Sequence, residues 1–107
     1  MSNQELEYKT LKVLEQHPQM TQRQLSKELG VSLGKAHYVL KALVEVGWIK
    51  LENFQRSGNK LGYAYLLTPA GVLEKAKITR RFLLRKQQEF AQLKREIEQL
   101  QTEVDEF

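Results

Sequence analysis

The last third of the chain carries a heptad pattern that only a long helix can satisfy. No proline or glycine follows Gly71 in the 107 residues. Apolar side chains recur at the a and d positions of successive heptads, namely Leu83, Phe90, Leu93, Ile97, Leu100, Val104 and Phe107. A helix over residues 69–107 would extend about 55 Å at ~1.5 Å per residue. A head of the remaining length cannot cover such a stripe, so the pattern predicts dimerisation through this helix.

The charges beside the stripe favour a parallel homodimer. Glutamates occupy its g positions, namely Glu89, Glu96 and Glu103. In a parallel pair Glu89 would face the partner's Lys94 at an e position, whereas an antiparallel pair would oppose glutamates. β-branched residues at a with leucines at d also favour two parallel strands. Lys86 occupies a d position, so the tight coiled coil is expected to begin after it.

Composition narrows the class of protein. The chain has no cysteine and two histidines, which removes disulfides, thiolate metal sites and cysteine nucleophiles. No glycine-rich phosphate loop, H-E-x-x-H motif or serine triad signature occurs. We therefore expect no enzyme activity, catalytic residue, cofactor or metal. The absence of an apolar leader and of a long apolar run predicts a cytoplasmic protein without a membrane contact.

The net charge of +4 is unevenly distributed. Residues 1–74 hold nine Lys/Arg and seven Asp/Glu, residues 75–86 hold six and none, and residues 87–107 hold two and six. Any contact with a polyanion is therefore local. Residues 75–86, the basic segment, could contact the backbone of a nucleic acid or form a solvated surface at the dimer junction. A membrane-surface role is weak because the segment has little bulky apolar face.

Three helices are expected before residue 47. Apolar spacing predicts a helix over residues 4–16, which ends at Pro18. Thr21 and Gln24 fit a capping box for a helix over residues 22–29. Gly30 and Ser32 are a typical helix stop and N-cap, so a third helix should run over residues 33–46. Its inward side chains are expected to be Val39, Leu43 and either Val46 or Leu40. This arrangement is a helix-turn-helix.

A β-hairpin should follow, with strands over residues 48–54 and 63–67 and a polar tip between them. Its aromatic residues, Trp48, Tyr63 and Tyr65, are better explained by packing than by base stacking. The predicted fold class is mainly α with a small hairpin: a winged helix-turn-helix over residues 1–68, then a long C-terminal dimerisation helix over residues 69–107. Thr68 and Pro69 suit the start of that helix.

The exposed face of the third helix is the candidate recognition surface, because this helix enters the DNA major groove in such folds. The candidates are Ser32, Gly34, Lys35, His37, Tyr38 and Lys41. Lys35 could contact a guanine edge or a phosphate, and the helix N-terminus suits a phosphate. The alternative is that these are ordinary solvated residues, and Tyr38 could equally be part of the core.

Two further sets complete the candidate interface. Thr21, Gln22 and Gln24 open the second helix, which usually crosses the DNA backbone, although capping alone explains Thr21 and Gln24. Arg56, Asn59 and Lys60 at the hairpin tip suit a minor groove or flanking phosphates, although a basic tip is also simply soluble.

Four strings carry a resemblance to the MarR family, and in detail to its EPS-associated transcriptional regulators. They lie at residues 24–35, 41–50, 59–71 and 79–83, and V-S-L-G-K and T-R-R-F-L are the more specific motifs within them. The resemblance implies a bacterial, sequence-specific DNA-binding regulator linked to exopolysaccharide biosynthesis genes. A homodimer on an inverted-repeat operator fits this reading, with double-stranded DNA as the partner.

The sequence departs from the wider MarR pattern at two points. Asn59 and Leu61 stand where the family wing carries Asp-x-Arg, so Arg56 or Lys60 would have to replace the usual arginine. Only one helix follows the wing, which argues against a small-molecule effector pocket between dimer and head. The alternative function is a winged-helix protein–protein interaction module without DNA binding.

Overall fold

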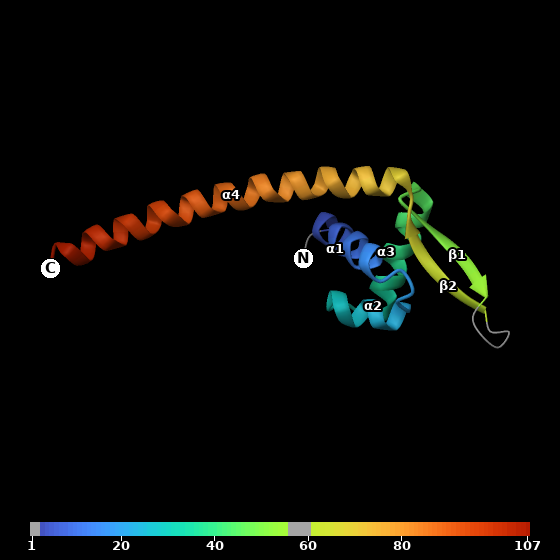
Figure 1. The fold of residues 1–107 in the computed structure, drawn as a ribbon. Helices are drawn as coiled ribbons and strands as arrows, with labels where there is room; N and C mark the ends of the chain where they lie inside the picture. Colours follow the sequence, from blue (N-terminus) through green and yellow to red (C-terminus); the bar gives the residue numbers. More distant parts are fainter. Residues whose placement is uncertain (1–2, 56–60) are drawn as a thin grey trace.

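The protein consists of a small head and one long helix that projects from it (Figure 1). The computed structural model describes residues 3–55 and 61–107. The elements follow in the order α1 (Asn3–Gln16), α2 (Gln22–Leu29), α3 (Leu33–Val46), β1 (Ile49–Gln55), β2 (Leu61–Leu67) and α4 (Pro69–Asp105). This confirms the predicted winged helix-turn-helix with a long C-terminal helix.

Local capping fixes the turn between α2 and α3. The Thr21 hydroxyl accepts a hydrogen bond from the Gln24 amide at 3.1 Å, and the Gln24 side chain accepts one from the Thr21 amide at 2.9 Å. Gly30 ends α2 with a φ of 68°, a conformation that costs glycine little. The Ser32 hydroxyl then caps α3 by accepting from the Lys35 amide at 3.1 Å. The predicted capping box, turn and N-cap are all confirmed.

The core of the head lies where α1, α2 and α3 meet the start of the hairpin. Its buried residues are Leu6, Leu11, Leu14, Leu25, Leu29, Val39, Leu40, Leu43, Ile49 and Tyr65. Leu40 is 2% exposed and Val46 is 54% exposed, so Leu40 is the third inward residue of α3 and Val46 is not. Leu40 shares the inner face with Val39 and Leu43, whereas Val46 is the last helical residue before Gly47.

The two strands pair antiparallel from Ile49 opposite Leu67 to Gln55 opposite Leu61. β1 lies one residue closer to the tip than the predicted 48–54, and β2 begins two residues earlier than the predicted 63–67. Backbone pairing in a two-stranded ribbon does not require apolar side chains, so it can extend beyond them. The Tyr65 amide donates to the Pro18 carbonyl at 2.9 Å, which ties β2 to the segment between α1 and α2.

Helix α4 starts against the head and then leaves it. A Cβ built on Gly71 would lie 1.9 Å from the Trp48 carbonyl oxygen, so only glycine allows this approach. Ile78 is buried, and the rings of Tyr8 and Phe82 lie edge to face with centroids 5.2 Å apart. The remainder of α4 projects, which gives the molecule extents of 74 × 25 × 24 Å. In the described part of the chain, no helix is long and apolar enough to span a bilayer.

Candidate DNA-binding surface

The solvent-facing side of α3 gathers the predicted recognition residues. The core side chains of α3 point to one side, and the exposed residues opposite follow the helical spacing of four, three and four: Gly34, Tyr38, Lys41 and Glu45. His37 and Lys35 flank this stripe and are also exposed. The structure therefore brings the predicted recognition residues to one accessible face.

Tyr38 is a surface residue. Its side chain is 63% exposed, so the interpretation that it belongs to the core is wrong. The Lys35 ammonium lies 5.1 Å from the centre of the Tyr38 ring, a distance suited to a cation–π contact. This contact holds a positive charge at the first turn of α3, beside the free amides of the helix N-terminus.

Glu45 is the member of this face that sequence reasoning missed. It lies seven residues after Tyr38 on the same side of α3 and is exposed. Its carboxylate would repel a phosphate, although it could accept a hydrogen bond from a cytosine amine. Its helical spacing from Gly34 and Tyr38 could have identified it in the sequence. A search for basic residues alone does not find a glutamate.

The predicted site residues at the start of α2 form hydrogen bonds within the protein. Thr21 and Gln24 form the capping box described above. The Gln22 amide nitrogen donates to the Tyr65 hydroxyl at 3.2 Å, which links α2 to the hairpin. Each of these three side chains therefore makes one hydrogen bond that stabilises the fold. Binding of the DNA backbone by these three residues stays a prediction.

A shallow groove of about 320 Å³ separates α3 from the hairpin. It brings together Gln22, His37 and Lys41, three of the predicted site residues, with Leu51 and Tyr65 on the hairpin side. The hairpin points away from the projecting part of α4 (Figure 1). Arg56, Asn59 and Lys60, the predicted wing residues, lie outside the described residues.

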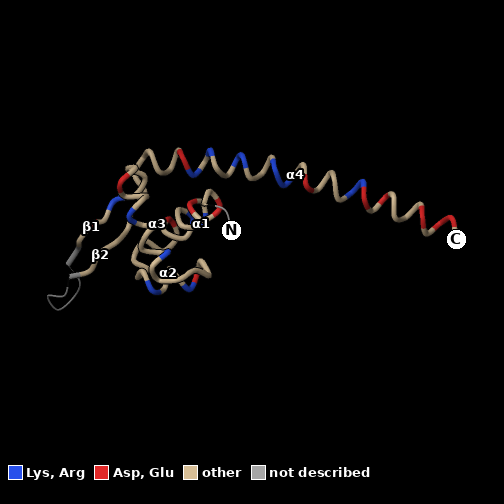
Figure 2. Tube along the Cα trace, turned by 180° about the vertical axis from the view of Figure 1, so that it is seen from behind, with Lys and Arg blue, Asp and Glu red and all other residues tan. Residues whose placement is uncertain are grey.

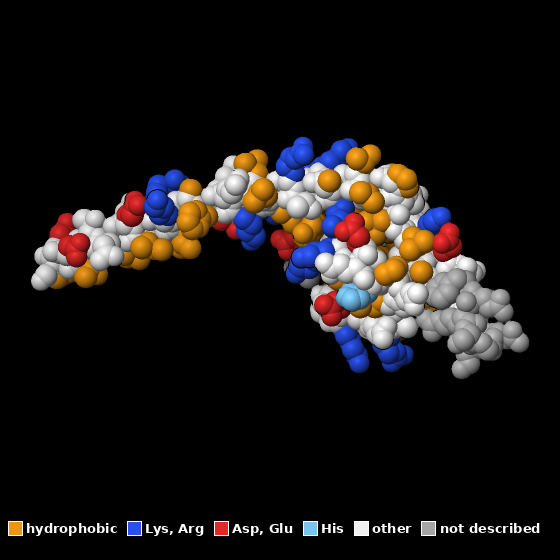
Figure 3. Space-filling model, in the orientation of Figure 1, with side chains coloured by type: hydrophobic (Ala, Val, Ile, Leu, Met, Phe, Trp, Pro, Cys, Tyr) orange, Lys and Arg blue, Asp and Glu red, His pale blue; other side chains and the backbone are white. Residues whose placement is uncertain are grey.

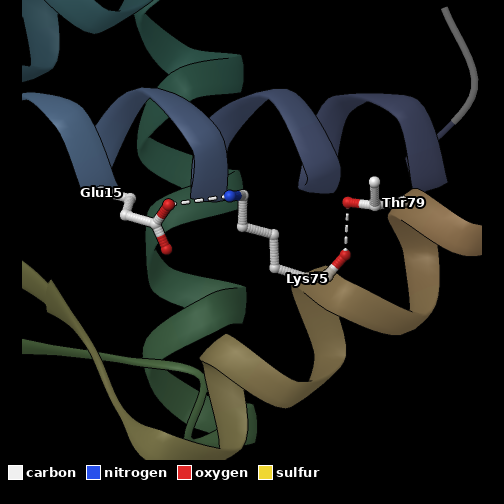
Figure 4. A network of polar contacts seen from close by, with 3 residues as sticks. All are labelled: Glu15, Lys75 and Thr79. Atoms are coloured by element: carbon white, nitrogen blue, oxygen red, sulfur yellow. Dashed lines mark hydrogen bonds and ion pairs between the residues drawn. The ribbon is translucent and has the colours of Figure 1, made fainter.

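Part of the basic segment is used to fasten α4 to the head. The Lys75 ammonium lies 2.8 Å from the Glu15 carboxylate of α1, and the Thr79 hydroxyl donates to the Lys75 carbonyl at 2.7 Å (Figure 4). Arg85 also approaches Glu5 of α1 at 4.0 Å. These pairs give the segment a structural role at the junction between α4 and the head.

Other basic side chains of the segment pair within α4. Arg81 lies 4.0 Å from Glu74, and Lys86 lies 3.1 Å from Glu89. Figure 2 shows that basic residues prevail along the part of α4 near the head and acidic residues toward the C-terminus. The candidate recognition residues lie on α3, whereas the basic segment lies on α4.

Comparison with known proteins agrees with the fold. Residues 4–50 match the family model described as "Winged helix-turn-helix DNA-binding". No curated protein matches the chain in sequence. A PadR-like transcriptional regulator from Bacillus cereus has a similar structure, with a TM-score of 0.72 and 18% identity over 82% of this chain and 90% of that one.

Two further solved structures are similar. Sso10a-2, a DNA-binding protein from Sulfolobus solfataricus, gives a TM-score of 0.67 at 19% identity, covering 88% of this chain and 92% of that one. Streptococcus pneumoniae FabT in complex with DNA gives 0.54 at 27% identity, covering 78% and 57%. Residues 4–50 and the hairpin that follows therefore have the winged helix-turn-helix fold.

Proposed function

We propose that this protein is a transcription regulator that binds an inverted-repeat operator in double-stranded DNA as a homodimer. The observation that carries the proposal is the exposed face of α3, where Lys35, Tyr38 and Lys41 follow one another along a helix that Ser32 caps. This face combines a helix N-terminus, two basic side chains and an aromatic ring on one accessible surface.

Each residue of this face has a distinct role in the proposal. The first turn of α3 enters the major groove, where Lys35 contacts a guanine edge and Lys41 a phosphate. Gly34 allows close approach, because a Cβ there would meet nothing within 4 Å and its absence leaves room for a base or sugar. The Ser32 hydroxyl accepts from the Lys35 amide, so its own proton can be donated to a phosphate oxygen. His37 contacts the DNA backbone beside the hairpin.

The flanking elements would position the head on the duplex. Thr21, Gln22 and Gln24 lie at the start of α2 and contact the backbone, and Arg56, Asn59 and Lys60 reach a neighbouring groove from the wing. One head covers one half-site. The exposed apolar stripe of α4 joins two heads, so that the operator has two-fold symmetry.

The biological setting follows from the sequence resemblance. The strings shared with the EPS-associated MarR group point to a bacterial, cytoplasmic regulator of exopolysaccharide biosynthesis genes. FabT, which is similar in structure, was solved in complex with DNA, and this supports the same use of the head here. The proposal requires no small-molecule effector, cofactor or enzyme activity.

A footprint on the DNA upstream of the protein's own gene tests the proposal. The expected result is protection of two related half-sites in opposite orientation, with bound protein of twice the chain mass by light scattering. Protection of no sequence at moderate salt, with binding to a protein partner instead, would favour the protein interaction module and overturn the proposal.

A further inference from the structure

An exposed apolar seam follows α4 from the head to the end of the helix at Asp105, two residues before the predicted end, and continues to Phe107. Its outer part is the stripe from Leu83 to Phe107, and each apolar residue there is more than half exposed. The same heptad spacing continues toward the head through Val72, Ala76 and Thr79, which are also exposed. Figure 3 shows hydrophobic side chains along the projecting helix.

The head end of this seam is a groove. A depression of about 460 Å³ lies between α1 and α4, and it is lined by Val72, Ala76, Thr79 and Leu83 together with the charged residues Glu15, Lys75 and Arg80. Ala76 and Thr79 have small side chains, which leave space in this depression. A large apolar side chain from another helix can therefore enter here.

The two ends of α4 carry opposite charge. The basic segment holds six Lys/Arg and no Asp/Glu, whereas residues 97–107 hold Glu98, Glu103, Asp105 and Glu106 and no Lys/Arg (Figure 2). A parallel pair of helices sets basic beside basic and acidic beside acidic. An antiparallel pair sets each basic segment beside the acidic end of its partner, which is electrostatically favourable.

The side chains of the seam also match better in the antiparallel direction. A parallel pair places Lys86 opposite the partner's Lys86 inside the apolar layer. In the antiparallel register that brings Phe90 against the partner's Leu93, the same lysine faces the partner's Ile97. Leu83 then meets the partner's Leu100, and Ala76 meets the partner's Phe107.

We propose that the second copy binds α4 antiparallel, with the C-terminal Phe107 of each chain seated in the groove beside the head of the other. The proposal rests on the homodimer proposed above and defines its interface. It replaces the parallel pairing favoured by the e and g positions. Lys75 and Phe82 occupy g positions near the head, and both already contact α1: Lys75 pairs with Glu15, and the Phe82 ring contacts Tyr8. These two g positions are therefore not free to pair with e positions of a parallel partner.

One repulsion opposes this register. Glu89 comes near the partner's Glu96 at the rim of the pair. This opposition of glutamates at g positions is the reason that the sequence favoured parallel helices. Lys86 already lies 3.1 Å from Glu89 and offsets its charge, and exposed pairs at a rim are screened by salt. The repulsion between these two glutamates is therefore smaller than the attraction between the basic segment of one chain and the acidic residues 97–107 of the other.

The antiparallel pair has a consequence for DNA. The two Gly71 residues would lie 41 residue steps apart along the pair, or about 60 Å at ~1.5 Å per residue. The heads then stand at opposite ends of the rod. Half-sites one helical turn apart, about 34–36 Å, would be too close for them.

Engineered cysteines test the direction directly, because the natural chain has none. Leu83→Cys, Leu100→Cys and the double variant are oxidised and run on non-reducing gels, with Gln88→Cys, off the seam, as the matched control. The expected result is a covalent dimer from the double variant, and from a mixture of the single variants, with neither single variant cross-linking to itself. Residues 83 and 100 of one helix are too far apart to bond within a chain.

The other outcomes are equally decisive. Self-linking of each single variant would show parallel helices and overturn this proposal while leaving the homodimer intact. A monomer by light scattering for the natural chain would overturn the homodimer as well. Thr79→Cys with Val104→Cys gives an independent pair in the same register, should substitution of a leucine disturb folding.

Discussion

The Thr68 hydroxyl donates a hydrogen bond to the Gly47 carbonyl at 2.6 Å. Gly47 ends α3, and Thr68 is the N-cap of α4, where its oxygen also accepts from the Gly71 amide at 3.0 Å. The Thr68 amide in turn donates to the Trp48 carbonyl at 3.0 Å. One side chain therefore joins the end of α3 to the start of α4.

Thr68→Val should weaken this junction while keeping the shape of the side chain. Loss of an N-cap costs about 1 kcal/mol, and loss of the bond to Gly47 adds to it. We expect a lower free energy of unfolding by denaturant titration. Thr102→Val is the matched control, since the Thr102 hydroxyl only bonds the Glu98 carbonyl within α4, and equal stability of the two variants would contradict the prediction.

Gly71→Ala should destabilise the head, because the added methyl would meet the Trp48 carbonyl oxygen at 1.9 Å. Overpacking of this kind costs about 1–3 kcal/mol. Gly34→Ala is the contrasting change: its methyl meets nothing within 4 Å, so the helix should gain about 0.5–1 kcal/mol. Thermal unfolding of both variants checks the predicted opposite signs, and shifts in the same direction would contradict it.

Tyr38→Ala should lower DNA affinity without unfolding the protein, because the ring is exposed and holds the Lys35 ammonium. An exposed cation–π contact is worth about 0.5–1 kcal/mol, or a 2- to 5-fold change in affinity. Tyr38→Phe keeps the ring and is expected to bind nearly as well as the natural protein. Fluorescence anisotropy measures both, and identical losses would show that the ring does not matter.

Lys75 and Lys41 should differ in how they affect the salt dependence of DNA binding. Lys75 is paired with Glu15, so Lys75→Gln leaves the slope of affinity against salt unchanged. Lys41→Gln removes one phosphate contact and reduces the slope by about one. Titrations at several salt concentrations separate the two, and a reduced slope for Lys75→Gln would place the basic segment on the DNA.

Local signals in the sequence were sufficient to predict most elements of the fold. Caps at Thr21, Ser32 and Thr68 and stops at Gly30 and Gly47 act within a few residues, so their effect can be read from the chain. The tie between Gln22 and Tyr65 spans 43 positions and depends on how the hairpin folds back on α2. No local sequence pattern predicts this contact.

The candidate site was predictable to a similar degree. The helical period of α3 places Gly34, Lys35 and Lys41 outward, and this requires no tertiary information. The exposure of Tyr38 and the burial of Leu40 depend on which side of α3 meets α1 and α2, so the sequence alone does not determine either. The pairing of Lys75 with Glu15 joins residues 60 positions apart and is set by packing alone.

Binding of the footprinted duplex and of a scrambled duplex by Lys35→Ala tests the central claim most directly. A lost base contact costs about 1–3 kcal/mol of discrimination, so the variant should lose about 5- to 150-fold of its preference for the operator. Lys12→Ala, on the exposed side of α1, serves as the control and should keep the natural preference. Equal preference in the natural protein and the Lys35 variant would contradict recognition through α3.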